Sequence, residues 1–322
     1  MYSCHRAFRV FFFTLIALGV CLTVPAEGDP APQSGGPWHT LVAVGDIMLA
    51  GSAKSLLEEK GYAYAFQDPS LAKIISSADV AFANLEYPVV EQSPAYQDKQ
   101  FTFKGSLTSL AAISQAGFDL LSLANNHTMD YGAEGLDSTI QACKRFHLTS
   151  AGAGNSPGEA RHLQVITKNG LRYGLLAYSL TYPKEFWASN GNAGTAYGDR
   201  KHLAQDIPLA AREVDILIVS FHWGEELNPQ PRPYQTALAH MAVDLGATLV
   251  LGHHPHIPQP IEIYRGAPIF YSLGNFAFGS LSANTPFSFV AEIRFLGSKP
   301  ARIILHPVNV NNHAVRFQPR AL

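Results

Sequence analysis

The stretch TLVLGHHPH, from Thr248 to His256, joins an apolar run of strand length to three histidines within four residues. The apolar part predicts a buried strand, since short continuous apolar runs are typical of strands covered on both faces. Adjacent imidazoles repel one another when protonated, and burying them neutral and unpaired gains little. A bound metal ion removes this conflict. On an extended turn, His254 and His256 are expected to lie on the same side as two metal ligands, with His253 facing elsewhere. Which of His253 and His254 is the ligand stays open.

Ligand-type side chains also follow other apolar runs of the chain. Asp46 and Glu86 close two runs near the N-terminus, Asn126 follows a third, and His222 ends a fourth. Each has an ordinary structural explanation when taken alone, such as a turn-forming acid or a packed histidine. The carboxyl ends of neighbouring parallel strands meet at one edge of a sheet, however, so these groups are expected to converge. Carboxylate, amide and imidazole ligands together predict a site for two divalent cations, with Mn, Fe and Zn suited almost equally.

The histidine directly after Asn126 has a different predicted role. His127 titrates near neutrality and is a candidate general acid that protonates a leaving group. Asp130 lies three residues further on and is placed to orient the imidazole through a ring N–H. A turn at Asn125-Asn126 with a merely packed histidine is the structural alternative.

Apolar runs alternate with helical patterns over most of the chain. The runs of strand length are Thr40–Val44, Val80–Ala83, Leu120–Ala124, Ile216–Phe221 and Thr248–Leu251. Between them, apolar residues recur at three- or four-residue spacing near residues 71–78, 136–143 and 238–245, which indicates amphipathic helices. Turns at Asn169-Gly170 and Arg265-Gly266 predict two hairpins, and further antiparallel strands are expected near residues 287–295 and 301–310. The pattern predicts a layered α/β (α+β) fold in which helices flank mixed β-sheets.

The N-terminal residues have the composition of a secretory signal. A basic start is followed by an uncharged apolar run from Val10 to Val24, which predicts a signal peptide at 1–26, with an uncleaved membrane anchor as the alternative. Residues 27–38 are predicted to form a disordered Pro/Gly linker, and residues 39–322 one domain. Removing 1–26 leaves 21 Lys+Arg and 25 Asp+Glu, a formal charge of −4, which does not favour nucleic acid as a partner. Cys143 is then the single cysteine, which excludes an internal disulfide.

At these motifs the chain resembles the CapA family of poly-γ-glutamate capsule synthesis proteins, whose fold is similar to that of calcineurin-like metallophosphoesterases. The resemblance runs from about Leu41 to Phe278 and is carried by the following segments: VGDIM (44–48), ANLE (83–86), ANNH (124–127) with Asp130, FHWGE (221–225), GHHPH (252–256) and IFYSLGNF (269–276). It implies a metal-ligand set with Glu86 as the bridging carboxylate and His127 as the general acid. The other ligands that it implies are Asp46, Asn126, His222, His254 and His256.

Two positions depart from the metallophosphoesterase pattern. Met48 stands where those enzymes carry a histidine, and its thioether is a poor ligand for a hard cation. Glu86 stands where they carry an aspartate. The first metal site is therefore expected to differ from theirs in affinity or selectivity.

Two functions are consistent with this sequence. The first is a metal-dependent hydrolase of the cell envelope that cleaves phosphoester or amide bonds, acting on a small phosphoester or on an anionic polymer such as poly-γ-glutamate. The second is a non-catalytic component of capsule synthesis, secreted or periplasmic, that binds the polymer or membrane subunits of the synthesis machinery. Polymer binding requires focused positive charge, for which Lys184, Arg200, Lys201 and Arg232 in or beside two long loops are candidates.

Overall fold

The computed structural model describes residues 10–11, 20–23, 37–279, 287–311 and 314–317. Most of the predicted signal peptide and linker therefore lies outside the described residues. Strand β3 begins at Trp38, the last residue assigned to the linker. No helix among the described ranges is long and apolar enough to cross a membrane.

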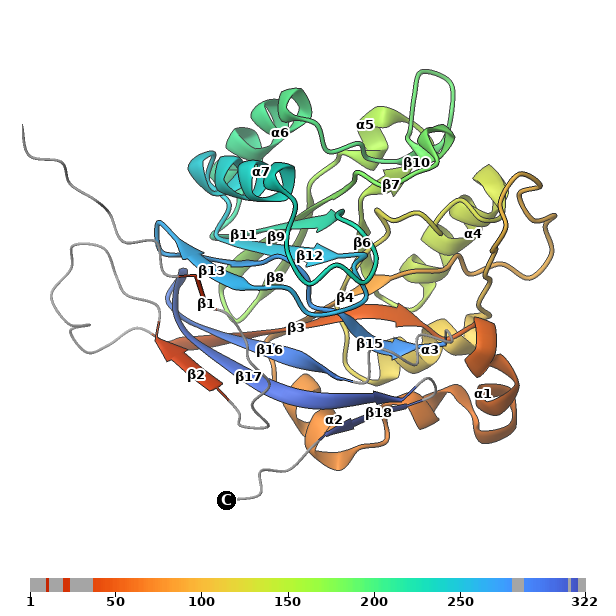
Figure 1. Ribbon diagram of the computed structural model, residues 1–322, viewed down its shortest axis with the longest axis horizontal. Coiled ribbons are helices and arrows are strands. Elements are labelled where there is room, and N and C mark those ends of the chain that lie inside the picture. The colour runs from red at the N-terminus through yellow and green to blue at the C-terminus, as the bar shows by residue number, and fades with distance from the viewer. Residues whose placement is uncertain (1–9, 12–19, 24–36, 280–286, 312–313, 318–322) are drawn as a thin grey trace, which may run out of the picture.

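Two large β-sheets face each other across the molecule, with helices on their outer sides (Figure 1). The nine-stranded sheet has the order β18-β17-β16-β3-β4-β5-β6, with β15 beside β3 and β2 beside β17. Its strands are β2 (Val20–Thr23), β3 (Trp38–Met48), β4 (Val80–Leu85), β5 (Leu120–Ser122), β6 (Thr149–Ala151), β15 (Asn275–Phe278), β16 (Phe287–Leu296), β17 (Lys299–Asn311) and β18 (Ala314–Phe317).

The seven-stranded sheet has the order β1-β13-β14-β12-β11-β9-β8. Its strands are β1 (Val10–Phe11), β8 (Gln164–Lys168), β9 (Leu171–Ser179), β11 (Ile216–His222), β12 (Leu249–His253), β13 (Ile261–Tyr264) and β14 (Ala267–Phe270). A small separate sheet pairs β7 (Ala153–Gly154) with β10 (Gly194–Thr195). Both predicted hairpins are confirmed, as β8–β9 and β13–β14 are antiparallel neighbours.

The helices cover the outer faces of the two sheets. The α-helices are α1 (Lys54–Lys60), α2 (Pro69–Ser76), α3 (Leu107–Gln115), α4 (Gly132–Arg145), α5 (Pro157–Ala160), α6 (Arg200–Glu213) and α7 (Pro233–Asp244), and the short 3-10 helices are η1 (Gly51–Ala53), η2 (Tyr62–Phe66) and η3 (Lys184–Phe186). The helices predicted near 71–78, 136–143 and 238–245 are confirmed as α2, α4 and α7. In Figure 1, α6 and α7 cover the seven-stranded sheet, and α1, α2 and α3 lie beyond the other one.

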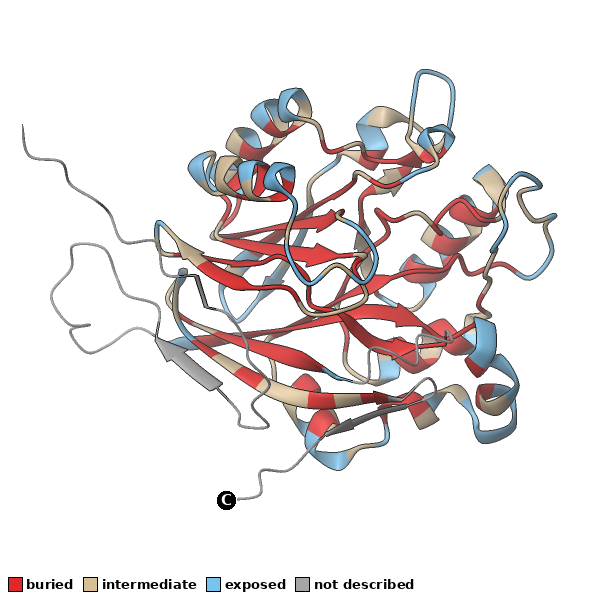
Figure 2. Ribbon diagram, viewed as in Figure 1, coloured by how far each residue is buried: buried red, intermediate tan, exposed pale blue. Residues whose placement is uncertain are grey.

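The alternation of side chains in β3 shows how the layers are packed. Leu41 and Ala43 belong to the core between the two sheets, whereas Val42 and Val44 belong to the core beneath the helices of the nine-stranded sheet. Successive strand residues face opposite sides, so a strand covered on both faces is apolar throughout. Figure 2 shows the buried strands between the more exposed helices. The predicted α/β sandwich of mixed sheets is confirmed.

Candidate metal centre

The site lies where parallel strands of both sheets end. β3, β4 and β5 run parallel in one sheet, and β9, β11 and β12 run parallel in the other. Their carboxyl ends bring the predicted ligands to the boundary between the sheets. β5 ends at Ser122, two residues before the predicted end, because the chain turns there. In this turn the Asn125 N–H and the Thr128 hydroxyl both donate to the Leu123 carbonyl.

Asp46 lies at the centre of the cluster and is fully buried. Its Oδ1 accepts a hydrogen bond from Asn84 Nδ2 at 2.9 Å and lies 3.0 Å from His253 Nδ1. Its Oδ2 lies 3.5 Å from His256 Nδ1. Burial alone would raise the pKa of Asp46, but hydrogen bonds with His253 and His256 outweigh it and hold that pKa well below its ordinary value. The carboxylate is therefore ionised.

Glu86 is the second buried carboxylate of the cluster. Burial, followed by the negative charge of Asp46, raises the pKa of Glu86 well above its ordinary value. Its Oε1 lies 3.7 Å from His222 Nε2 and 3.9 Å from His256 Nε2, yet makes no hydrogen bond within the described structure. A bound cation would stabilise the ionised form of this buried carboxylate, because it would replace the hydration lost on burial.

The imidazoles come from the opposite sheet. His222 ends β11, and its Nε2 lies 2.8 Å from Asn126 Oδ1, which joins two of the predicted ligands across the sheets. Burial, and to a smaller extent repulsion from His254 when that ring is protonated, lowers the pKa of His222 well below its ordinary value. Burial, followed by His256, likewise lowers the pKa of His254 to about 3. Both rings are neutral at pH 7, the form in which histidine binds a metal.

All three histidines of the 253–256 stretch reach the cluster. The expectation that His253 faces elsewhere is wrong, because its Nδ1 contacts Asp46 while His254 and His256 approach Glu86. The chain achieves this with left-handed backbone at two of them, since φ is 95° at His254 and 59° at His256. Such conformations cost about 1–3 kcal/mol each and are concentrated at functional sites.

The ligand atoms form two groups that share one residue. Asp46, Glu86 and His222 each offer an atom within 4.8 Å of the others, and Glu86 does the same with His254 and His256. Glu86 Oε1 and His254 Nδ1, both from residues of these groups, are buried without a hydrogen-bond partner among the described residues. The same holds for four atoms of residues outside the groups: His253 Nε2, His39 Nδ1, Tyr173 Oη and Ser220 Oγ. The unpaired atoms of Glu86 and His254 fit divalent cations, with Glu86 placed between the two groups.

His127 and Asp130 form a pair beside the ligand groups. His127 Nδ1 lies 2.7 Å from Asp130 Oδ2, as the spacing predicts. Burial lowers the pKa of His127, although the Asp130 carboxylate opposes this shift. Phe103 supports the pair in two ways: its ring centroid lies 4.9 Å from that of His127, and its backbone N–H donates to Asp130 Oδ2 at 2.8 Å.

Two residues of the site were missed by the sequence reasoning. Asn84 donates to Asp46 and lies 3.4 Å from His222 Nδ1, and its place two residues before Glu86 in a fully buried strand was the available signal. Lys99 comes from the loop between β4 and α3, and its ammonium donates to the Asn126 carbonyl at 2.6 Å and to Asp130 Oδ1 at 2.5 Å. No sequence pattern marks Lys99, because the fold alone brings its loop to the site.

A protein-family model described as "Bacterial capsule synthesis protein PGA_cap" matches residues 40–280. The chain belongs to this family. It is 33% identical over 278 residues to the capsule biosynthesis protein CapA of Bacillus anthracis, covering 84% of this chain and 67% of that protein. It is 32% identical over 270 residues to the PGA biosynthesis protein CapA of Bacillus subtilis, covering 83% and 70%.

Solved structures show the same fold at low sequence identity. A hypothetical protein from Thermus thermophilus superposes with a TM-score of 0.53 at 15% identity, covering 84% of this chain and all of that one. The NAD nucleotidase NadN of Haemophilus influenzae superposes with a TM-score of 0.51 at 10% identity, covering 88% of this chain and 59% of that protein. The resemblance to the metallophosphoesterase fold is confirmed.

Proposed function

We propose that this capsule-synthesis family member is a hydrolase that uses two divalent cations to cleave phosphoester or amide bonds in poly-γ-glutamate capsule metabolism. The observation that carries this proposal is the pair of ligand groups sharing Glu86, with buried atoms that lack any other partner. The names of the relatives support the capsule setting, since two of them are biosynthesis proteins named CapA. The sequence of the first 26 residues supports a place outside the cytoplasmic membrane.

The cations, held by the two groups, would supply Lewis acidity that stabilises negative charge developing on the substrate. The residues around them have separate tasks. Asn84 fixes the orientation of the Asp46 carboxylate through its hydrogen bond. Asp130 Oδ2, 2.7 Å from His127 Nδ1, orients the imidazole. Only the doubly protonated ring carries a proton on Nε2, so His127 would act as general acid in its imidazolium form, which the Asp130 carboxylate stabilises.

The second candidate is a non-catalytic role in binding the polymer or membrane subunits of the synthesis machinery. It is supported by a relative from Mycobacterium tuberculosis, 31% identical over 232 residues, which is named "Probable polyglutamine synthesis accessory protein". Of the basic loop residues expected to serve it, Arg232 is already paired with Glu225, which reduces its value as an anion-binding group. The hydrolase is therefore the better-supported function.

The test measures bound metal and hydrolysis in parallel. The purified protein is analysed for Mn, Fe and Zn, and then assayed against phosphomonoesters, phosphodiesters and γ-linked oligoglutamate. We expect roughly two equivalents of metal, and loss of both metal and turnover in Asp46→Asn and His254→Ala. Asp215→Asn, a change at a partly exposed carboxylate at the opposite end of β11 from His222, is the control and should retain both. A wild-type protein that binds no metal, or turnover that ignores the Asp46 and His254 changes, would refute the proposal.

A further inference from the structure

A cavity lies away from the metal centre, at the C-terminal end of α4. Its volume is about 830 Å³, and its walls come from α4, β6, β7, α5 and β8. This size is typical of pockets that hold an organic ligand rather than a single ion. We call it the α4 groove. β6 is the last strand of the nine-stranded sheet and β8 the last strand of the seven-stranded sheet, so two sheet edges border the groove.

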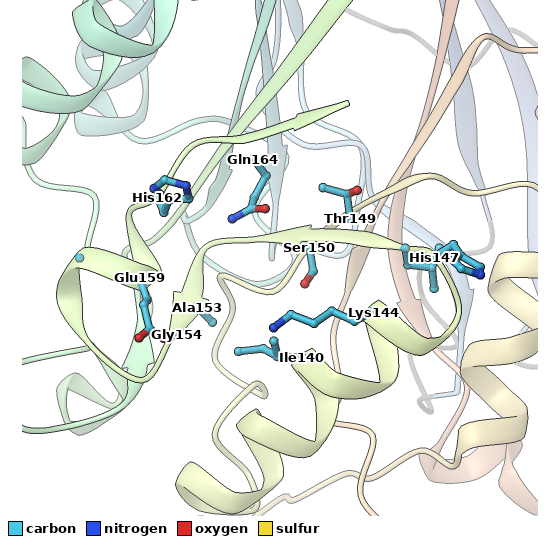
Figure 3. A pocket seen from close by; sticks show the side chains of 12 residues that line it. Ile140, Lys144, His147, Thr149, Ser150, Ala153, Gly154, Glu159, His162 and Gln164 are labelled. Carbon is cyan, nitrogen blue, oxygen red and sulfur yellow. The ribbon is translucent and has the colours of Figure 1, made fainter. Parts of the chain in front are cut away.

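Among the described residues, the α4 groove has one charged side chain without a partner, Lys144, and one that is already hydrogen-bonded, Glu159. Lys144 extends into the cavity beside Ile140 and below Ser150 (Figure 3), and its ammonium has no ion-pair or hydrogen-bond partner within the described structure. Glu159 is the lining carboxylate, but its Oε2 already accepts the Asn155 N–H at 3.0 Å. Further hydrogen-bonding groups are provided by Thr149, Ser150 and Gln164, and imidazoles by His147 and His162.

Lys144 also has an ordinary structural explanation, because a basic residue in the last turn of a helix interacts favourably with the helix dipole. Lys73 occupies the same kind of position in α2, and it too is exposed without an ion-pair partner in the described part of the chain. What separates them is the cavity, since Lys73 does not line the α4 groove. The helix dipole therefore accounts for a lysine at this place, but not for a lysine reaching into a cavity lined with hydrogen-bonding groups.

We propose that the α4 groove is a binding site for an acidic polypeptide chain, with a side-chain carboxylate on Lys144 and the chain lying along the edges of β6 and β8. The inference rests on the proposed function for its substrate class, an anionic polymer. α4 starts two residues after Asp130, and its 14 residues rise about 21 Å at roughly 1.5 Å per residue. A polymer bound in the groove would thus be held a few helical turns from the metal centre, which raises its local concentration there.

The test measures binding of fluorescein-labelled oligoglutamate, α-linked and γ-linked, to the full-length protein by anisotropy at low salt. Lys144→Gln should weaken binding about two- to fivefold, the range expected for one partly exposed ion pair. Lys73→Gln is the matched control and should bind like wild type. A neutral oligoglutamine of equal length should bind more weakly than either oligoglutamate. The groove proposal would be overturned if Lys144→Gln bound oligoglutamate as tightly as wild type. It would also be overturned if Lys144→Gln and Lys73→Gln lost the same amount of affinity.

A further variant separates this proposal from the proposed hydrolase. His254→Ala removes a predicted metal ligand but leaves the α4 groove intact, so Lys144→Gln should weaken oligoglutamate binding by the same factor in this background as in the wild type. Hydrogen exchange on adding oligoglutamate should slow at residues 149–151 and 164–168 in both proteins. Binding that is lost in His254→Ala and unchanged in Lys144→Gln would place the polymer at the metal centre alone. That result would contradict the groove proposal but not the proposed hydrolase.

Discussion

Replacing Lys99 with methionine should destabilise the protein because it removes polar contacts at the candidate site, while the apolar packing of the core is unchanged. The Lys99 ammonium donates to the Asn126 carbonyl and to Asp130, and its side chain is 14% exposed. Methionine keeps most of the apolar stem and removes the charge. Asp130 would then keep its contacts with the Phe103 N–H and His127, but would lose its fixed positive partner.

The expected magnitude follows from these contacts. A hydrogen bond to a charged group contributes about 1.5–3 kcal/mol, and removing one partner of a buried ion pair costs about 3–5 kcal/mol. Burial lowers the pKa of Lys99, which reflects the cost of desolvating its charge; methionine does not bear this cost, and this offsets part of the loss. We therefore expect Lys99→Met to lower the free energy of unfolding by about 2–4 kcal/mol. Lys99→Arg should restore about half, because guanidinium retains the charge but not the compact geometry.

Urea denaturation at pH 7, followed by circular dichroism, measures this difference. Lys104→Met is the control, since Lys104 belongs to the same loop but has no carboxylate partner among the residues that the structure describes. Its ammonium makes a 3.5 Å contact with the Glu91 carbonyl and lies 5.3 Å from the ring centroid of Tyr131. The control should change the free energy of unfolding by less than about 1 kcal/mol. A Lys99→Met protein as stable as Lys104→Met would show that Lys99 does not hold the His127–Asp130 segment.

Two further predictions concern the sheet that carries Asp46. A hydrogen bond with His306 holds the pKa of Glu292 below its ordinary value, so this pair stabilises the fold above the ordinary carboxyl pKa and the contribution is lost as the pH falls. Unfolding measured between pH 7 and pH 3 should therefore lose more stability in wild type than in Glu292→Gln, and parallel curves would contradict this. A Cβ at Gly45 would lie 1.7 Å from the Gly274 carbonyl oxygen, so Gly45→Ala should lower stability by about 3 kcal/mol or more or prevent folding. Gly158→Ala, whose Cβ would meet nothing nearer than 3.9 Å, should fold normally, and a soluble Gly45→Ala protein of unchanged stability would disprove the packing argument.

The sequence predicts the strands of the fold well because they are buried on both faces. Such strands appear as unbroken apolar runs, and the residue that follows each run is placed at the site by the parallel arrangement. Asp46, Glu86 and His222 could be found for this reason. His253 ends β12 on the same face as Leu249 and Leu251, which belong to the core between the sheets, so strand alternation was the available signal. It was missed because the strand was predicted to end at Leu251, and the left-handed backbone at His254 and His256 has no sequence signal.

The remaining parts of the site depend on long-range contacts. Lys99 reaches Asp130 from a loop without helix or strand periodicity, so no local pattern places it. α6 was also missed, since Pro208 lies inside it and interrupts the helical signal. Met48, whose place suggested a changed first metal site, is fully buried in the core beneath the helices, where a thioether packs well.

The ligand groups draw on both layers of the sandwich, with Asp46 and Glu86 from one sheet and His222 and His254 from the other. An ion coordinated there would cross-link the two layers, in addition to the apolar packing and the polar contacts that already join them. The binding free energy of the ion would then add directly to the free energy of unfolding. For each bound cation, a tenfold rise in free cation above the dissociation constant would add about 1.4 kcal/mol to the free energy of unfolding, and a chelator would remove the whole of that ion's contribution.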